Sequence, residues 1–169
     1  YPGDLTKTDA GADFINPGGV VGSKIEAVGI VYHSGSADYA EWLPKKNNTD
    51  EFIAGQVIGV KNGQVSLKTE TADHIFVIST QPAVLGNMPP EGRTENHEKV
   101  AFLGQVPVLI KGKVNLGDYV VASGKNDGLA ISISKNDISP ADLSKVIGVA
   151  WDEATNPNAI NSVNVALGI

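Results

Sequence analysis

Short runs of β-branched and aromatic residues, separated by glycine-rich turns, most limit how this chain can fold. Residues 57–60 and 65–67 are two such runs, and Asn62-Gly63 stands between them. Asn-Gly is the dipeptide most typical of a tight β-hairpin. The 169 residues include 19 glycines and 9 prolines, and this scatter is typical of many strands joined by turns. We therefore predict a mostly β fold with very little helix, in which short antiparallel strands and hairpins form one or two small barrels or sandwich lobes.

One unit, made of a glycine turn, a strand, a glycine loop and a return strand, occurs twice. Its first copy starts at Gly55 and its second at Gly117, about 62 residues later, which exceeds the period of common solenoid repeats. We infer a β module over residues 25–169, made of two related lobes, 25–98 and 99–169. Residues 1–24 are rich in Gly, Asp, Thr and Pro, and we expect them to form an irregular lead-in.

Other segments carry weaker signals. Strands are favoured over residues 25–32 and 74–79, residues 37–44 are expected to form a strand or a turn that ends at Pro44, and residues 100–112 predict either two strands or one long bent strand. Pro107 has no N–H to give to a neighbouring strand, so it is expected at an edge or a bulge. Ser139-Pro140 predicts one short helical turn, because Ser is a good N-cap and Pro fits the first helical position. The charged stretch 91–98 is expected to be a loop.

Charge and composition exclude several classes of protein. The formal net charge is −6 and the 13 Lys and Arg residues are dispersed, so we expect no nucleic-acid partner. The chain has no cysteine, which excludes disulfides, thiolate metal sites and cysteine nucleophiles. No window holds 18 apolar residues, so no membrane insertion is expected. The start lacks an initiator Met and the last residues read as a strand; we expect a piece of a longer polypeptide.

The usual motifs of catalysis and metal binding do not occur in the sequence. His33, His74 and His97 do not have the spacing of a zinc site. There is no Gly-x-Ser-x-Gly nucleophile elbow and no phosphate-binding loop. We expect no cofactor and no metal ion.

The densest group of polar and aromatic residues is Asp38-Tyr39-Ala40-Glu41-Trp42. In one interpretation Tyr39 and Trp42 anchor the core while the two acids face water. In another, Asp38 and Glu41 are a pair of carboxylates for acid–base chemistry, which requires a raised pKa on one of them. Trp42 and Trp151 are expected by default to pack in the core, and the alternative is that Tyr39, Trp42 or Trp151 stacks on a sugar.

Several segments, taken in order, resemble one protein family. They are residues 38–44, the Gly-x-Val-Ile strand that follows, residues 77–86 (Val-Ile-Ser-Thr-Gln-Pro-Ala-Val-Leu-Gly), residues 101–108 and Gly117-Asp118-Tyr119-Val120. This order is similar to the C-terminal domain of bacteriophage tail appendages and of bacterial tail-fibre-like proteins, over roughly residues 25–169. The resemblance implies a β-rich module on a homotrimeric fibre, in contact with the rest of its own chain and located extracellularly, on a virion or phage-tail-like particle.

The same resemblance implies a specific activity. Some members of the family are intramolecular chaperones that promote trimerisation and then cut themselves off near the Asp-Tyr-Ala-Glu motif. If this applies here, Asp38 and Glu41 are the catalytic carboxylates and the cut falls close to Ser36. The sequence thus leaves three hypotheses: a structural and assembly module of a fibre, which leads; a self-cleaving chaperone domain, the one enzymatic hypothesis; and a module that binds a cell-surface carbohydrate.

Overall fold

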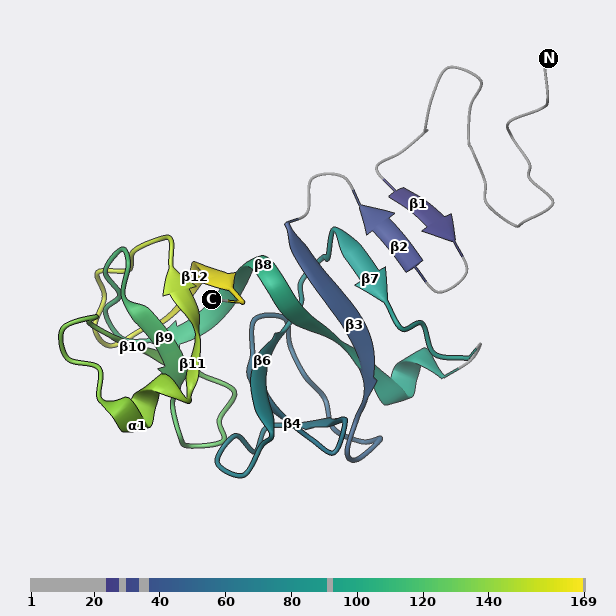
Figure 1. The fold of residues 1–169 in the computed structure, drawn as a ribbon, viewed down its shortest axis with the longest axis horizontal. Helices are drawn as coiled ribbons and strands as arrows, with labels where there is room; N and C mark the ends of the chain where they lie inside the picture. Colours follow the sequence, from purple (N-terminus) through teal and green to yellow (C-terminus); the bar gives the residue numbers. More distant parts are fainter. Residues whose placement is uncertain (1–23, 28–29, 34–36, 91–92, 169) are drawn as a thin grey trace, which may run out of the picture.

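The computed structural model describes residues 24–27, 30–33, 37–90 and 93–168, and strands dominate them (Figure 1). The mostly β prediction is confirmed. The predicted irregular lead-in over residues 1–24 lies outside the described residues, apart from Lys24, which begins the first strand.

Twelve strands, one short helix and one 3₁₀ turn follow along the described residues. They are β1 (Lys24–Ala27), β2 (Ile30–His33), β3 (Asp38–Pro44), β4 (Val57–Lys61), β5 (Gln64–Ser66), β6 (His74–Ile78), β7 (Val84–Gly86), η1 (Thr94–Asn96), β8 (His97–Lys111), β9 (Tyr119–Ala122), β10 (Ala130–Ile133), α1 (Pro140–Leu143), β11 (Val146–Ala150) and β12 (Ile160–Leu167).

Five strands in the C-terminal half close into a barrel. Their order is β8-β10-β9-β11-β12, and β12 pairs back onto β8 to complete the ring. Four of the five pairings are antiparallel, whereas β10 runs parallel to β8 at Ala130 and Ile110. A closed ring leaves none of these strands as an open edge, which removes the usual site of strand-to-strand aggregation.

The N-terminal half repeats the same strand order. β3 pairs with β8, β8 with β6, β6 with β4 and β4 with β5. A parallel bridge between Lys45 and Val65 joins β5 to the end of β3, and the N–H of Lys46 donates to the carbonyl of Val65 at 2.8 Å. Each ring is therefore closed by one parallel contact, with β4 and β9 in equivalent central positions. We call these the first and second rings.

The strand β8 belongs to both rings. Its N-terminal part pairs with β3 and β6, and its C-terminal part pairs with β12 and β10. Gly104 lies between the two parts with φ of +104°, where a Cβ atom would come within 2.2 Å of the Ala37 carbonyl oxygen. The expectation of one long bent strand is thus met, and glycine permits the bend because it tolerates both the positive φ and the close approach.

The turns explain why the hairpins form where the sequence places them. Asn62 and Gly63 have φ of 51° and 73°, as a type I′ turn between β4 and β5 requires. The turns that open the two repeats, at Gly55 and Gly117, have nearly equal φ of 84° and 83°. The short helix α1 has Pro140 at its start, as predicted.

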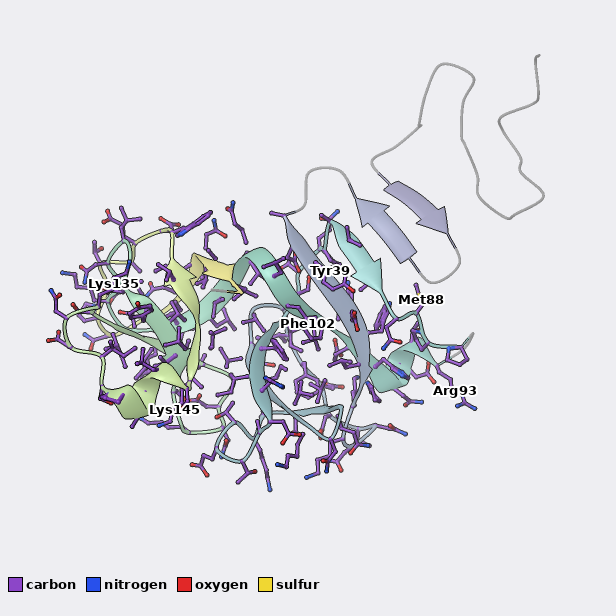
Figure 2. All side chains as sticks on the ribbon, in the orientation of Figure 1. Tyr39, Met88, Arg93, Phe102, Lys135 and Lys145 are labelled. Carbon is purple, nitrogen blue, oxygen red and sulfur yellow. The ribbon has the colours of Figure 1, made fainter. Side chains whose placement is uncertain are left out.

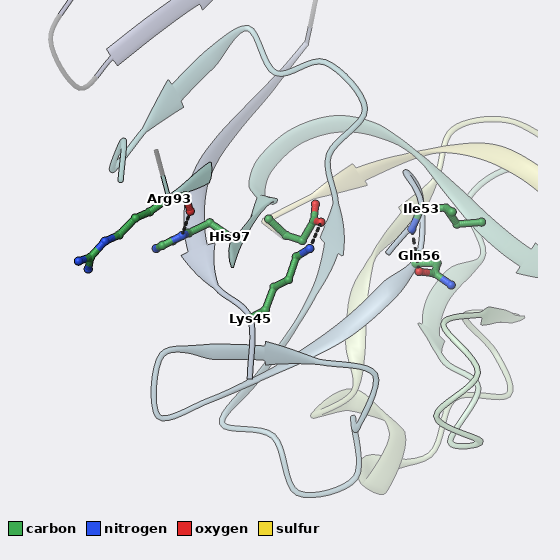
Figure 3. Close-up of polar contacts among 6 residues, drawn as sticks. Lys45, Ile53, Gln56, Arg93 and His97 are labelled. Carbon is green, nitrogen blue, oxygen red and sulfur yellow. Dashed lines mark hydrogen bonds and ion pairs between the residues drawn. The ribbon is translucent and has the colours of Figure 1, made fainter. Parts of the chain in front are cut away.

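Two local expectations are wrong. Residues 25–32 do not form one strand: β1 and β2 pair antiparallel, with Ala27 opposite Ile30. The stretch 91–98 is not wholly a loop, because η1 occupies Thr94–Asn96 and β8 starts at His97. Two contacts hold the chain here (Figure 3). His97 Nδ1 and the carbonyl oxygen of Arg93 form a hydrogen bond of 2.8 Å, and Lys45 forms an ion pair of 3.3 Å with Glu98.

The core runs through both rings. Its largest cluster contains Val106, Val120 and Val163 from the second ring together with Val57 and Val77 from the first. The loop after β9 strengthens this join, because Oδ1 of Asn126 accepts from the N–H of Thr69 at 3.0 Å. Within the described residues, none of the helices has the length and apolar character needed to cross a membrane.

Candidate functional site

The strand β3 presents the residues singled out from the sequence on two opposite faces. Side chains alternate along a strand, so Asp38, Ala40 and Trp42 share one face while Tyr39 and Glu41 share the other. The burial of β3 agrees, since Asp38 and Ala40 are buried and Tyr39 is exposed. Asp38 and Glu41, three positions apart, therefore point away from each other.

Asp38 lies in a buried polar contact. Its side chain is only 4% exposed, and its Oδ2 accepts a hydrogen bond of 2.7 Å from Oγ of Ser79, which is itself 3% exposed. Burial raises the pKa of the Asp38 carboxyl above its ordinary value, and the bonds from Ser79 and from its own backbone N–H, with the charge of Lys99, oppose that rise. A carboxyl that favours its protonated form can give a proton at a higher pH than an exposed one.

Glu41 has a different partner. The phenol of Tyr39 donates to Oε1 of Glu41 at 2.5 Å. This bond is the main cause that raises the pKa of Tyr39. Glu41 is thus held by a neighbour on its own strand, on the face opposite to Asp38.

The two tryptophans lie in different environments. Trp42 packs against Ala40 and Leu85 and is partly buried, and its Nε1 is buried without a hydrogen-bond partner among the described residues. Trp151 is 55% exposed. The default expectation of core packing is therefore met in part by Trp42 and is wrong for Trp151.

Four aromatic side chains form a row across the strands of the first ring, and the sequence did not predict this aromatic row. Tyr39, Phe102, Phe76 and His74 follow one another with centroid separations of 6.3, 4.6 and 5.8 Å. Figure 2 shows Tyr39 and Phe102 side by side. Leu103, opposite Tyr39 in the register, is 56% exposed. The row leads into a groove of 730 Å³ between the two rings, whose lining includes Phe76, Phe102, Ile131 and Leu167.

The two histidines with described side chains lie in separate contacts. His74 belongs to the aromatic row and His97 contacts the Arg93 carbonyl, while the side chain of His33 and all of Ser36 lie outside the described residues. Among the residues that the structure describes, no three His, Asp or Glu side chains gather as metal ligands would.

The fold is similar to that of a bacteriophage protein. The chain aligns with a crystal structure described as that of pre-mature gene product 12 of bacteriophage phi29, with a TM-score of 0.55 and 15% sequence identity. The alignment covers 94% of this chain and 24% of gene product 12, so the chain spans about a quarter of that protein. No family model matches the sequence, and no curated protein matches it.

At 15% identity the likeness to gene product 12 shows a shared fold and assigns no residue a role. The residues that stand out on chemical grounds are those of this chain itself: the buried pair Asp38–Ser79, the bonded pair Tyr39–Glu41 and the aromatic row. Ser79 was missed because it is 41 residues from Asp38, and nothing local in the sequence marks it.

Proposed function

We propose that this chain is a structural and assembly module of a phage-tail-like or bacterial surface fibre protein, and that it promotes folding and trimerisation of that fibre. The observation that carries the proposal is the likeness in fold to gene product 12 of bacteriophage phi29 over 94% of the chain. The order of motifs that resembles tail-appendage domains supports it independently. The module would act outside the cell, on a virion or a tail-like particle.

The exposed apolar surface also supports an assembly role. Tyr39 and Leu103 lie opposite each other on β3 and β8, and they are 38% and 56% exposed. Tyr39 also contacts Phe102, which lines the groove between the rings together with polar and apolar side chains. Neighbouring exposed apolar residues are typical of surfaces that another chain covers. In the proposed homotrimer, that other chain is a second copy.

The native mass of the protein tests this function. We expect light scattering after gel filtration to give three times the 17.6 kDa of the chain, and denaturing electrophoresis to give a single chain of full length. A chain that stays monomeric at high concentration would contradict trimerisation.

A second candidate is a self-cleaving chaperone domain, favoured by the environment of Asp38. A buried carboxyl with a raised pKa is suited to acid–base work on a peptide bond, and Asp38 lies two residues after Ser36, where the resemblance places the cut. Glu41 remains the second carboxylate of that proposal, although it faces the opposite side of β3.

Incubation of a chain extended at its N-terminus tests the second candidate. Cleavage would appear on denaturing gels as two fragments, and the new ends of both would lie near Ser36. We expect Asp38→Asn to stop it and Glu41→Gln, which removes the same charge from the other face of β3, to slow it less. A chain that stays intact on prolonged incubation, while forming trimers, would leave only the structural role.

A further inference from the structure

The outer face of the second ring carries an exposed tryptophan beside two amide side chains. Trp151 follows β11 directly and is 55% exposed. Most large aromatic side chains of a folded protein bury the greater part of their surface. An indole left in water next to hydrogen-bonding groups is the kind of surface that suits a polar ligand with an apolar face.

The register of the sheet places this tryptophan in a row that crosses three strands. Ala150 pairs with Val165, and the N–H of Trp151 donates to the Asn164 carbonyl at 2.9 Å, so Trp151 lies opposite Asn164. Asn164 in turn lies opposite Pro107 of β8. Residues directly opposite each other share a face. Neighbouring strands are about 5 Å apart, so the row spans roughly 10 Å, about the length of a disaccharide.

The middle of the row offers hydrogen-bonding capacity. Nδ2 of Asn164 donates to Oε1 of Gln105 at 2.8 Å. That bond uses one hydrogen and one lone pair, and each amide carries two donors and two acceptor sites in all. Both amides can therefore still give and accept hydrogen bonds. A sugar hydroxyl also gives and accepts, which makes an amide pair a natural partner for it.

A cleft continues the row beyond Pro107. It measures 220 Å³ and is lined by Gln105, Asn164, Thr80 and Gln81, and also by Asp38 of the candidate site on β3. The cleft gives a ligand lying on the row a polar wall on one side, in addition to the flat surface of Trp151 and Pro107. A site with one apolar platform and several placed polar groups has the general character of a small-ligand site.

We propose that Trp151, Asn164, Gln105 and Pro107 form a binding site for a neutral glycan. The C–H face of one pyranose ring stacks on the Trp151 indole, and its hydroxyls bind the amides of Asn164 and Gln105. The next sugar lies over Pro107, toward the cleft. Asp152 and Glu153 are exposed beside Trp151 and the chain carries a net charge of −6, so acidic sugars are repelled. This activity goes beyond the assembly function and does not depend on it.

Titration of the ¹⁵N-labelled protein with cellobiose and with N,N′-diacetylchitobiose tests the proposal. We expect at least one of them to shift the indole signal of Trp151 and the side-chain amide signals of Asn164 and Gln105, with a Kd of roughly 1 mM for so open a site. The indole of Trp42, which packs against Ala40 and Leu85 on β3, is the internal control and stays in place.

Two substitutions separate the site from a general surface effect. Trp151→Ala weakens binding about tenfold, because the stacking platform is lost. Leu143→Ala removes a side chain of nearly equal exposure, 54%, from α1 and leaves binding unchanged. The proposal is wrong if neither disaccharide shifts these signals at about 10 mM, ten times that Kd, or if Trp151→Ala leaves the shifts intact. It is also wrong if Trp151→Ala lowers the native mass, since the face would then be a contact between subunits.

Discussion

The hydroxyl of Ser79 donates a hydrogen bond of 2.7 Å to Oδ2 of Asp38, and both side chains are buried. The contact joins the start of β3 to the end of β6, two strands that do not pair with each other but that both pair with β8. A polar pair buried between strands of one ring fixes how those strands meet, because either group left alone would lose its partner without regaining water.

The first prediction concerns the pH dependence of stability. Burial raises the pKa of Asp38 in the folded protein above its value in the unfolded chain. The protonated carboxyl therefore contributes fully to the free energy of unfolding at pH below the pKa in the unfolded chain. That contribution is lost as pH rises through the higher pKa in the folded protein. Asp38→Asn cannot ionise. The stability of this variant relative to the natural chain therefore rises from acid to neutral pH. Urea titrations across that range measure the difference.

The control for this series is Asp137→Asn, which alters an exposed carboxylate. Its stability relative to the natural chain is expected to change little over the same range. If the Asp38→Asn curve runs parallel to that of the natural chain at every pH, Asp38 has no raised pKa in the folded protein.

The second prediction concerns Ser79. Ser79→Ala removes the donor from a buried carboxyl and is expected to lower the free energy of unfolding by about 2 kcal/mol. The Ser79 bond also lowers the pKa of Asp38 in the folded protein, so its loss moves the upper end of the pH-dependent fall in stability to higher pH, while the start of that fall, at the unfolded pKa, stays in place. Ser79→Thr keeps the hydroxyl and is expected to restore part of both effects. A loss of stability with no movement along the pH axis would mean that packing alone is affected.

The third prediction concerns the bend of β8. Gly104 has φ of +104° and a Cβ there would lie 2.2 Å from the Ala37 carbonyl oxygen, whereas Gly124 has φ of +74° and open space around it. Gly124→Ala costs about 1 kcal/mol, for the backbone conformation only. Gly104→Ala costs roughly 3 kcal/mol, since a steric clash is added. Denaturant titration of the two variants separates the contributions, and equal losses would mean that the strand shifts to make room.

The fourth prediction concerns assembly. Leu103→Asp places a charge among the exposed apolar groups beside Tyr39 and is expected to weaken the proposed homotrimer at least tenfold, or by about 1.4 kcal/mol. Leu116→Asp changes a residue that is even more exposed, at 64%, but that lies in the turn before β9, and it should leave the trimer intact. Sedimentation over a range of concentrations measures both. If the two variants behave alike, Leu103 is not part of the subunit contact.

Much of the fold follows from local signals in the sequence. Asn62-Gly63 sets a turn that few other dipeptides favour, and the turns at Gly55 and Gly117 mark the two repeats. The closure of the rings does not follow from such signals, because it depends on β8 pairing with strands on both sides. Residues 25–32 were misread for a related reason: an apolar run that contains Gly29 is compatible with either one strand or two.

The candidate site, like the fold, could be predicted from the sequence only in part. Once residues 38–44 are taken as a strand, the alternation of side chains already separates Asp38 from Glu41. The exposure of Trp151 could not be predicted from alternation. Residues 146–150 before it are apolar without alternation, so the sequence does not show which positions of this strand face the core. Its partners Asn164 and Pro107 are brought to it only by the sheet register.

The strand shared by the two rings has a consequence for the order in which the chain acquires its structure. Every strand pairing of the first ring lies within residues 38–104, so these pairings need no residue that is synthesised later. The first ring holds the start of β8 extended. The rest of β8 continues beyond that ring, and β12 and β10 pair with it there. The last strand of the first ring, β8, is thus also the first strand of the second ring, so growth from one end of the polypeptide and completion of the fold proceed in the same direction.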